Sequence, residues 1–282
     1  MRVCPSVGSR KIRHTVLAGD YLKRGVAEFI GTFALIFIGA GSLIYGDLVG
    51  AAFAHGLVIA VMVSSVGMIS GGHFNPAVTF AFLVTRRIEA SLAAFYWLVQ
   101  LAGATLAALL LWWVLPPGGK STLHLGAPSI DHTINAGKAV AIEAVLTFFL
   151  VWVIFATAVD SRGAFKQIAG LGIGLTITLD ILMGGGLTGA AMNPARAFGP
   201  QLASGDWKHF WVWYVGPLAG ATIAAVTYEM LYLRDQVAEV AGDDMADDET
   251  GDTADVVAAT EPAHSHDGDS AHAAGEGTDA SI

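Results

Sequence analysis

Two Asn-Pro-Ala tripeptides are the residues whose types and spacing most clearly predict chemistry. Proline has no N–H and fits the first turn of a helix, and the asparagine before it fits the N-cap, where its side-chain oxygen accepts from the backbone. The asparagine amide then still has N–H groups to offer to another molecule. Each tripeptide therefore predicts a helix start that presents hydrogen-bond donors, and the residues concerned are Asn75, Pro76, Ala77, Asn193, Pro194 and Ala195.

The segments around both tripeptides share further features. SGGHFNPAVTF at 70–80 and LTGAAMNPARAFGP at 187–200 place small residues before the asparagine. Such sequences favour irregular backbone, which a membrane tolerates only where the backbone lines a cavity or is buried in protein. The apolar pieces that follow, near 76–85 and 194–203, are too short to cross a bilayer, so we predict two re-entrant half-helices.

The composition indicates a membrane protein. The 282 residues are 54% hydrophobic and 14% charged, whereas soluble domains usually carry about 25% charged residues. A helix that crosses a bilayer needs about 20 consecutive apolar residues. Six runs meet this requirement, roughly at 25–45, 51–70, 90–115, 138–159, 167–185 and 209–233.

The charges divide the chain into three parts. Of the 24 acidic residues, 14 follow Arg234, so the formal net charge of -9 belongs to the C-terminal tail and indicates no nucleic-acid partner. Lys and Arg are more frequent on the side of the predicted spans that holds both termini, which predicts a multi-pass cell-membrane protein with cytoplasmic termini. The predicted parts are a basic arm at 1–20, a membrane domain at 21–234 and a disordered acidic tail at 239–282.

The two halves of the membrane domain, 21–118 and 136–234, resemble each other. Glu28 and Glu143 both lie early in the first span of their half, and Asn75 and Asn193 occupy matching places. Three spans per half is an odd number, so the second half must be inverted relative to the first. We therefore predict an all-α membrane fold of six spans and two half-helices related by a pseudo-two-fold axis in the membrane plane.

This symmetry brings the two half-helix N-termini together near the middle of the membrane. Each N-terminus carries about half a positive charge. Two such ends at a narrow pore repel cations, while the asparagine amides donate to the oxygen of a water molecule. The residues therefore predict a water-filled pore with a central barrier to protons and ions.

The chain resembles the aquaporins, also called major intrinsic proteins, over roughly residues 20–234. The resemblance rests on AEFIGT at 27–32, SGGHFNPAVTF, MNPARAFGP and WVWYVGPLAG at 211–220. It implies a passive water channel that assembles as a homotetramer in the lipid bilayer, with one pore per subunit. It implies no cofactor and no bound metal.

The family also has a constriction on the outward side of the asparagine pair. Counting from each asparagine places this selectivity filter at His55, Ile181, Ala190 and Arg196. A buried arginine at membrane depth is costly and usually functional. The four residues resemble the filter of plant tonoplast intrinsic proteins, many of which also pass ammonia or urea, so we expect water and a small neutral solute.

Other polar residues receive roles from the same resemblance. Glu28 and Glu143 are expected to hold the re-entrant loops, and His73 to border the cytoplasmic vestibule. His124, or alternatively His132, could add a further histidine to the filter or lie exposed in its loop. Asp180 fits no part of the pattern; it could pair with His55 or Arg196, or lie at a subunit contact.

Three other functions were compared with the water channel. A glycerol-type facilitator typically has Trp in the second span and Asp after the filter arginine, where this chain has His55 and Ala197. A proton-coupled secondary transporter also has inverted repeats and broken helices, but it needs titratable groups along its path. An enzyme is not expected, because the sequence shows no nucleophile–base pair, metal-ligand spacing or phosphate-binding loop beside a strand.

Overall fold

The computed structural model describes residues 18–43, 46–116, 124–162 and 168–234, and it contains only helices and connections in these ranges. The predicted disordered tail at 239–282 lies outside them, as do residues 1–17 of the predicted arm. The first helix begins at Ala18, inside that arm. The prediction of an all-α membrane fold is confirmed.

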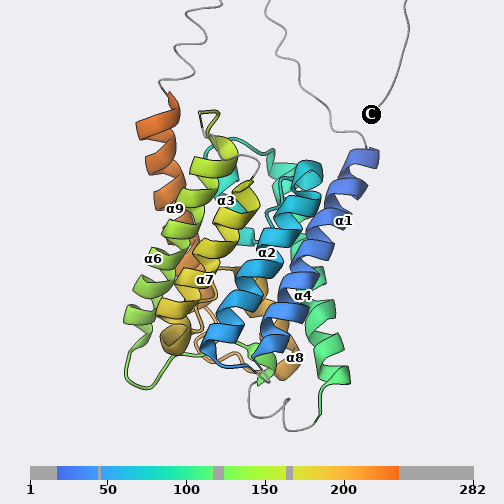
Figure 1. The fold of residues 1–282 in the computed structure, drawn as a ribbon, viewed down its shortest axis with the longest axis vertical. Helices are drawn as coiled ribbons and strands as arrows, with labels where there is room; N and C mark the ends of the chain where they lie inside the picture. Colours follow the sequence, from blue (N-terminus) through green and yellow to red (C-terminus); the bar gives the residue numbers. More distant parts are fainter. Residues whose placement is uncertain (1–17, 44–45, 117–123, 163–167, 235–282) are drawn as a thin grey trace, which may run out of the picture. The chain divides into compact units, whose positions relative to one another are not determined.

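Six helical segments correspond to the six predicted spans (Figure 1). Three end in a π-helical turn: η1 after the first, η3 after the fourth and η5 after the sixth. The bounds are α1 Ala18–Ala34 with η1 Leu35–Ala40, α2 Leu48–Ser70, α4 Ala90–Val114, α6 Ala136–Ile154 with η3 Phe155–Val159, α7 Ala169–Thr188, and α9 Val212–Tyr228 with η5 Glu229–Leu233.

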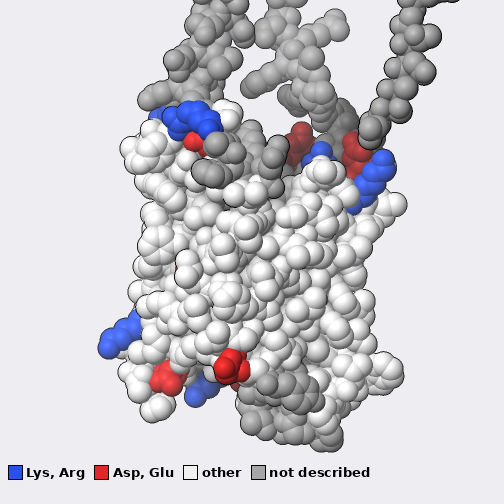
Figure 2. Space-filling view, viewed as in Figure 1, with Lys and Arg blue, Asp and Glu red and all other residues white. Residues whose placement is uncertain are grey.

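Four of the described helices are long and apolar enough to cross a membrane by length and composition alone: α2, α4, α6 with η3, and α7. The helix α1 is shorter and begins with charged residues, and α9 reaches a spanning length only together with η5. Figure 2 shows the charged side chains of one face mainly at its two ends, with a broad belt of other residues between them. This belt matches the apolar interior of a bilayer.

The two short helices follow the Asn-Pro-Ala tripeptides, as predicted. They are α3 Pro76–Val84 and α8 Pro194–Ser204, each with proline in its first turn and asparagine at its N-cap. The Oδ1 atoms of Asn75 and Asn193 accept from the backbone N–H of Ala77 and Ala195 at 2.8 and 2.9 Å. Figure 1 shows α3 in the upper half of the helical domain and α8 in the lower half, as re-entrant segments from opposite ends require.

Matching helices pack in matching ways in the two halves. The helix α1 packs on α4, and α6 packs on α9; the half-helix α3 contacts α9, and α8 contacts α4. The same kind of contact recurs within the halves, since a Cβ added to Gly103 would meet the Phe29 carbonyl and one added to Gly220 would meet the Ala144 carbonyl. The predicted inverted repeat is therefore visible in the packing.

The two halves join where α2 crosses α7. A Cβ on Gly56 would meet the carbonyl of Gly174, and a Cβ on Gly174 would meet the carbonyl of Gly56. The two backbones are therefore in direct contact, which is how small residues allow helices to associate in membranes. This crossing holds α2 and α7, which carry two of the four predicted filter residues, at a fixed separation.

Gly174→Ala should destabilise the protein although alanine favours a helix by about 1 kcal/mol over glycine. The added methyl group has no space at the crossing, and overpacking costs about 1–3 kcal/mol. Gly172→Ala on the same helix is the control, because its Cβ would make only ordinary contacts at 3.8 and 3.9 Å. The measurement is the thermal unfolding midpoint in detergent; equal midpoints for the two variants would contradict the role of the crossing.

Candidate functional site: a transmembrane pore

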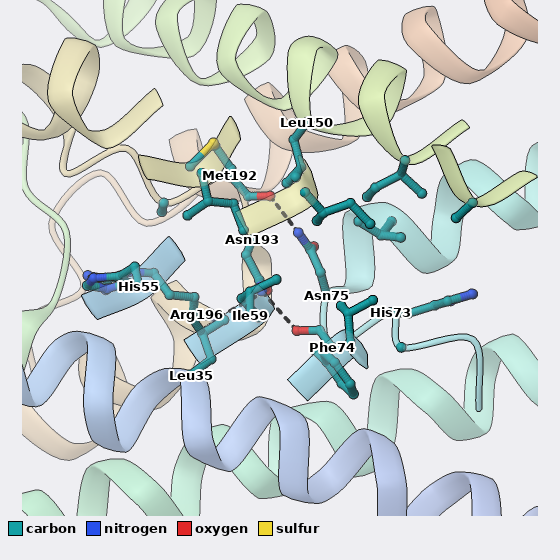
Figure 3. A pocket seen from close by; sticks show the side chains of 18 of the residues that line it. Leu35, His55, Ile59, His73, Phe74, Asn75, Leu150, Met192, Asn193 and Arg196 are labelled. Carbon is teal, nitrogen blue, oxygen red and sulfur yellow. Dashed lines mark hydrogen bonds between the residues drawn. The ribbon is translucent and has the colours of Figure 1, made fainter. Parts of the chain in front are cut away.

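The two capping asparagines meet at the centre of the helical domain. Asn75 Nδ2 donates to the carbonyl of Met192 at 2.9 Å, and Asn193 Nδ2 donates to the carbonyl of Phe74 at 2.9 Å (Figure 3). Each bond joins one half of the chain to the other. A side-chain amide has two N–H groups, so one donor of each asparagine is left for the cavity that both residues line.

The loops before the asparagines have the same backbone conformation. Gly71, Gly72 and Phe74 have positive φ angles of 96°, 64° and 48°; in the second half Gly189, Ala190 and Met192 have 81°, 42° and 51°. Left-handed conformations are costly for residues with a Cβ. Phe74 in the first loop and Ala190 and Met192 in the second adopt left-handed conformations. Surrounding contacts must therefore stabilise the backbone of both loops.

The carboxylate of Glu28 supplies these contacts in the first half. It accepts from the Ser70 hydroxyl at 2.7 Å, from the N–H groups of His73 and Phe74 at 2.9 and 2.7 Å, and from Gln100 Nε2 at 2.8 Å. All four groups are donors, so the carboxylate acts here only as an acceptor. Glu28 is fully buried.

Glu143 repeats this arrangement in the second half. It accepts from the Thr188 hydroxyl at 2.7 Å and from the N–H groups of Ala191 and Met192 at 3.0 and 2.7 Å. These contacts support the loop-holding role that the sequence predicts for both acids. Sequence reasoning missed the matched hydroxyls of Ser70 and Thr188, although their spacing equals that of the two asparagines and would have indicated them.

Three of the four predicted filter residues line two cavities at once. His55, Ile181 and Arg196 border the long central cavity with the asparagines, and they also border an outer cavity on the opposite side. They therefore lie where the two cavities join. Ala190 lines only the central cavity, and Gly189 beside it lines the outer one.

The polar groups of the predicted filter residues form one chain of hydrogen bonds. Arg196 Nη1 donates to the carbonyl of Gly126 at 2.6 Å, and Arg196 Nη2 lies 3.2 Å from His55 Nε2. His55 Nδ1 lies 2.8 Å from the carbonyl of Ala51. A carbonyl only accepts and a guanidinium only donates, so His55 is neutral, with its proton on Nδ1.

These bonds use two of the five N–H groups of the Arg196 guanidinium. Arg196 Nε is buried and has no hydrogen-bond partner among the described residues. Arg196 lines both cavities, so its guanidinium borders the passage between them. Sequence reasoning missed the Gly126 carbonyl; the signal was a glycine two residues after the candidate filter residue His124. Its φ of 77° places Gly126 in the left-handed region.

His73 lies at the other end of the central cavity. Its Nδ1 is 3.0 Å from the Thr79 hydroxyl, and its ring centroid is 4.5 Å from that of Phe82. Both His73 and Phe82 line the cavity. His73 therefore lies away from His55, on the other side of the asparagines (Figure 3), and its vestibule role stays a prediction.

The two loop histidines differ in position. His124 lines the outer cavity with His55 and Arg196, while its Nδ1 lies 3.4 Å from an Asp206 carboxylate oxygen. His132 is largely exposed and lies beside Asp131 at 3.5 Å; it lines neither of the two cavities that meet at the filter. Two hydrogen bonds from Thr133 keep the pKa of Asp131 below its usual value.

Asp180 pairs with neither of its predicted partners. The described structure gives it no hydrogen bond to His55 or Arg196, and it lines neither cavity at the filter. Its Oδ2 atom is buried without a hydrogen-bond partner among the described residues. Only 6% of the residue is exposed within one chain.

The described residues also contain no group of three or more His, Cys, Asp or Glu side chains that could hold a metal ion. The fold and the site together define a multi-pass membrane protein with a pore lined by two half-helix N-termini. Comparison with known proteins agrees with this class. A family profile described as Major intrinsic protein matches residues 16–228.

Related proteins cover most of the chain. Aquaporin TIP1-2 of Zea mays is 43% identical over 76% of this chain and 87% of its own length. Probable aquaporin TIP3-2 of Oryza sativa subsp. japonica is 43% identical over 74% of this chain and 81% of its own length. The solved structure of the aquaglyceroporin from Plasmodium falciparum superposes with a TM-score of 0.69 at 25% identity, covering 77% of this chain and 99% of that one.

The chain belongs to the major intrinsic protein family, the aquaporins. The family resemblance seen in the sequence is thereby confirmed.

Thr188→Val should lower the stability of the protein and its water permeability. The Thr188 hydroxyl donates to Glu143 and accepts from the N–H of Ala190 at 3.1 Å, and a buried polar group left unsatisfied costs about 1–3 kcal/mol. Thr147→Val is the control, since that buried hydroxyl donates only to the Glu143 carbonyl of its own helix. A thermal midpoint for Thr188→Val as high as that of Thr147→Val would show that the loop does not depend on this bond.

Proposed function

We propose that this protein is a passive channel that conducts water in single file and excludes protons and ions. The observation that carries the proposal is the pair of reciprocal bonds in which Asn75 and Asn193 join the two half-helix N-termini within one cavity. Similarity to relatives named aquaporins supports it.

The barrier to protons follows from this geometry. The positive ends of α3 and α8 face the same space, and the free N–H of each asparagine donates to the oxygen of the water between them. A water molecule held in this way points its hydrogens outward on both sides, so it cannot accept a proton from a neighbouring water. The helix-end charges oppose cations at the same place.

The same proposal assigns solute selection to His55, Ile181, Ala190 and Arg196. Arg196 offers a positive charge and Nη N–H groups beyond its two bonds, and neutral His55 offers no further charge. Ile181 supplies an apolar wall. A constriction with these side chains admits small uncharged polar molecules. The expected solutes are therefore water together with ammonia or urea.

His124 is proposed as an outer contribution to this filter. It shares the outer cavity with His55 and Arg196. The channel is further proposed to be a homotetramer with both termini in the cytoplasm of a cell membrane, as the family resemblance and the Lys and Arg distribution indicate. An internal membrane is the alternative location, given the resemblance to tonoplast intrinsic proteins.

The two alternative transport functions have less support. Glycerol transport is suggested by the aquaglyceroporin-like fold, but Ala197 and His55 stand where glycerol facilitators carry Asp and Trp. Proton-coupled transport needs titratable groups that exchange protons with the path. The carboxylate oxygens of Glu28 and Glu143 are already occupied by donors.

Purified protein in liposomes should raise osmotic water permeability, measured by stopped-flow light scattering, without raising proton leak. Parallel gradients of ammonia, urea and glycerol should show flux of ammonia or urea exceeding that of glycerol. A rise in water permeability alone would limit the function to water. Flux driven by a proton gradient would favour the secondary transporter instead.

Arg196→Val should keep water permeability and increase the flux of urea and glycerol severalfold, because the variant removes both the charge and the bulk that narrow the filter. Arg234→Val is the control, since Arg234 is an exposed arginine at the end of η5. Unchanged urea-to-water and glycerol-to-water ratios in Arg196→Val would contradict the filter assignment.

A further inference from the structure

Asp180 is the acidic residue whose position the channel function leaves unexplained. It lies in α7, directly before the filter residue Ile181. Within the part of the chain that the structure describes, its Oδ2 atom is buried without a hydrogen-bond partner. Neighbouring helix positions point about 100° apart. The side chain therefore lies in the wall behind the filter, outside the water path.

The face of α7 that carries Asp180 is turned toward α6. One turn further along, a Cβ on Gly184 would meet Leu146 and Ile142 of α6. One more turn along, the Thr188 hydroxyl donates to Glu143 of α6. Asp180, Gly184 and Thr188 are four residues apart and share one helix face, so Asp180 extends the α6–α7 contact that holds the outer loop.

The elements packed against α7 are α2, α6 and η3. Their titratable and charged residues are His55 on α2 and Lys138 and Glu143 on α6, and η3 has none. Arg196 approaches from the filter side, and Asp131 reaches α7 only through its backbone N–H, which donates to the Leu187 carbonyl.

None of these groups compensates a negative charge at Asp180. Both ring nitrogens of His55 are engaged, by Ala51 and Arg196. Lys138 is exposed at the outer end of α6. The third neighbour, Glu143, is itself an acid. An unpaired carboxylate inside a span is far more costly than a neutral carboxyl group, so the acid remains protonated where it is buried.

We propose that Asp180 is a proton-binding positioning residue: as a neutral acid it allows α7 to pack on α6, and its ionisation at alkaline pH lowers water permeability. An ionised Asp180 repels the Glu143 carboxylate and draws in water. Both effects loosen the contact that fixes Ile181 and the loop containing Ala190. The permeability effect rests on the proposed channel function; the protonation of Asp180 does not.

The first test measures osmotic water permeability in liposomes with equal pH on both sides, between about pH 6 and about pH 10, a range that includes the pKa values documented for buried acids. The water permeability of the unmodified protein should fall about twofold or more at the alkaline end. This change corresponds to a coupling energy at the low end of the range known for packed elements. Asp180→Asn, a neutral side chain of the same shape, should keep its neutral-pH permeability throughout.

Asp20→Asn is the matched control, because Asp20 is exposed in the first turn of α1. It should retain the alkaline loss of the unmodified protein. A flat pH profile for the unmodified protein, or an alkaline loss that persists in Asp180→Asn, overturns the proposal. Asp180→Thr serves as a second neutral variant if the asparagine variant does not fold.

The second test does not depend on transport. Infrared difference spectroscopy of the protein in liposomes should show the carbonyl stretching band of a protonated carboxyl group at neutral pH. The band should disappear on alkaline titration and be absent from Asp180→Asn. Its presence in Asp180→Asn contradicts the assignment. The band could be found although liposomes with the protein are no more permeable to water than empty liposomes at any pH. In that case the proposed channel function is wrong and the proton site at Asp180 stands.

Discussion

The acceptance of loop donors by the carboxylates of Glu28 and Glu143 is the interaction on which the rest of the pore depends. Each loop leaves the helical conformation inside the membrane, where no water is present to satisfy its N–H groups. Each carboxylate takes two of these N–H groups and one hydroxyl. The loops can then hold Phe74, Ala190 and Met192 at positive φ, which turns the asparagines toward each other.

The filter depends on a second, less symmetric set of bonds. Arg196 is oriented by the Gly126 carbonyl and by a neutral His55, whose tautomer is fixed by Ala51. The crossing of α2 and α7 at Gly56 and Gly174 sets the distance between His55 and Ile181. The charged arginine is therefore held by neutral partners, which leave its positive charge uncompensated, as the proposed filter role requires.

Much of the fold followed from the sequence, because the spans are long apolar runs and the half-helices begin with Asn-Pro. The beginning of α1 at Ala18 was missed, since Asp20, Lys23 and Arg24 interrupt hydrophobicity without interrupting the helix. The proposed pairing of Asp180 was not found either. Sequence periodicity places a residue on a helix face, but it does not say which neighbours occupy the opposite face.

The sequence by itself determined the family, the inverted repeat and the places of the capping asparagines, because these depend on local residue types and on spacing along the chain. The tertiary structure alone decided that Asn75 and Asn193 bond across the repeat and that the Gly126 carbonyl orients Arg196. It also decided that Asp180 Oδ2 is buried with no hydrogen-bond partner among the described residues. These contacts join residues far apart in the chain. Their geometry depends on how the two halves pack, which no single segment encodes.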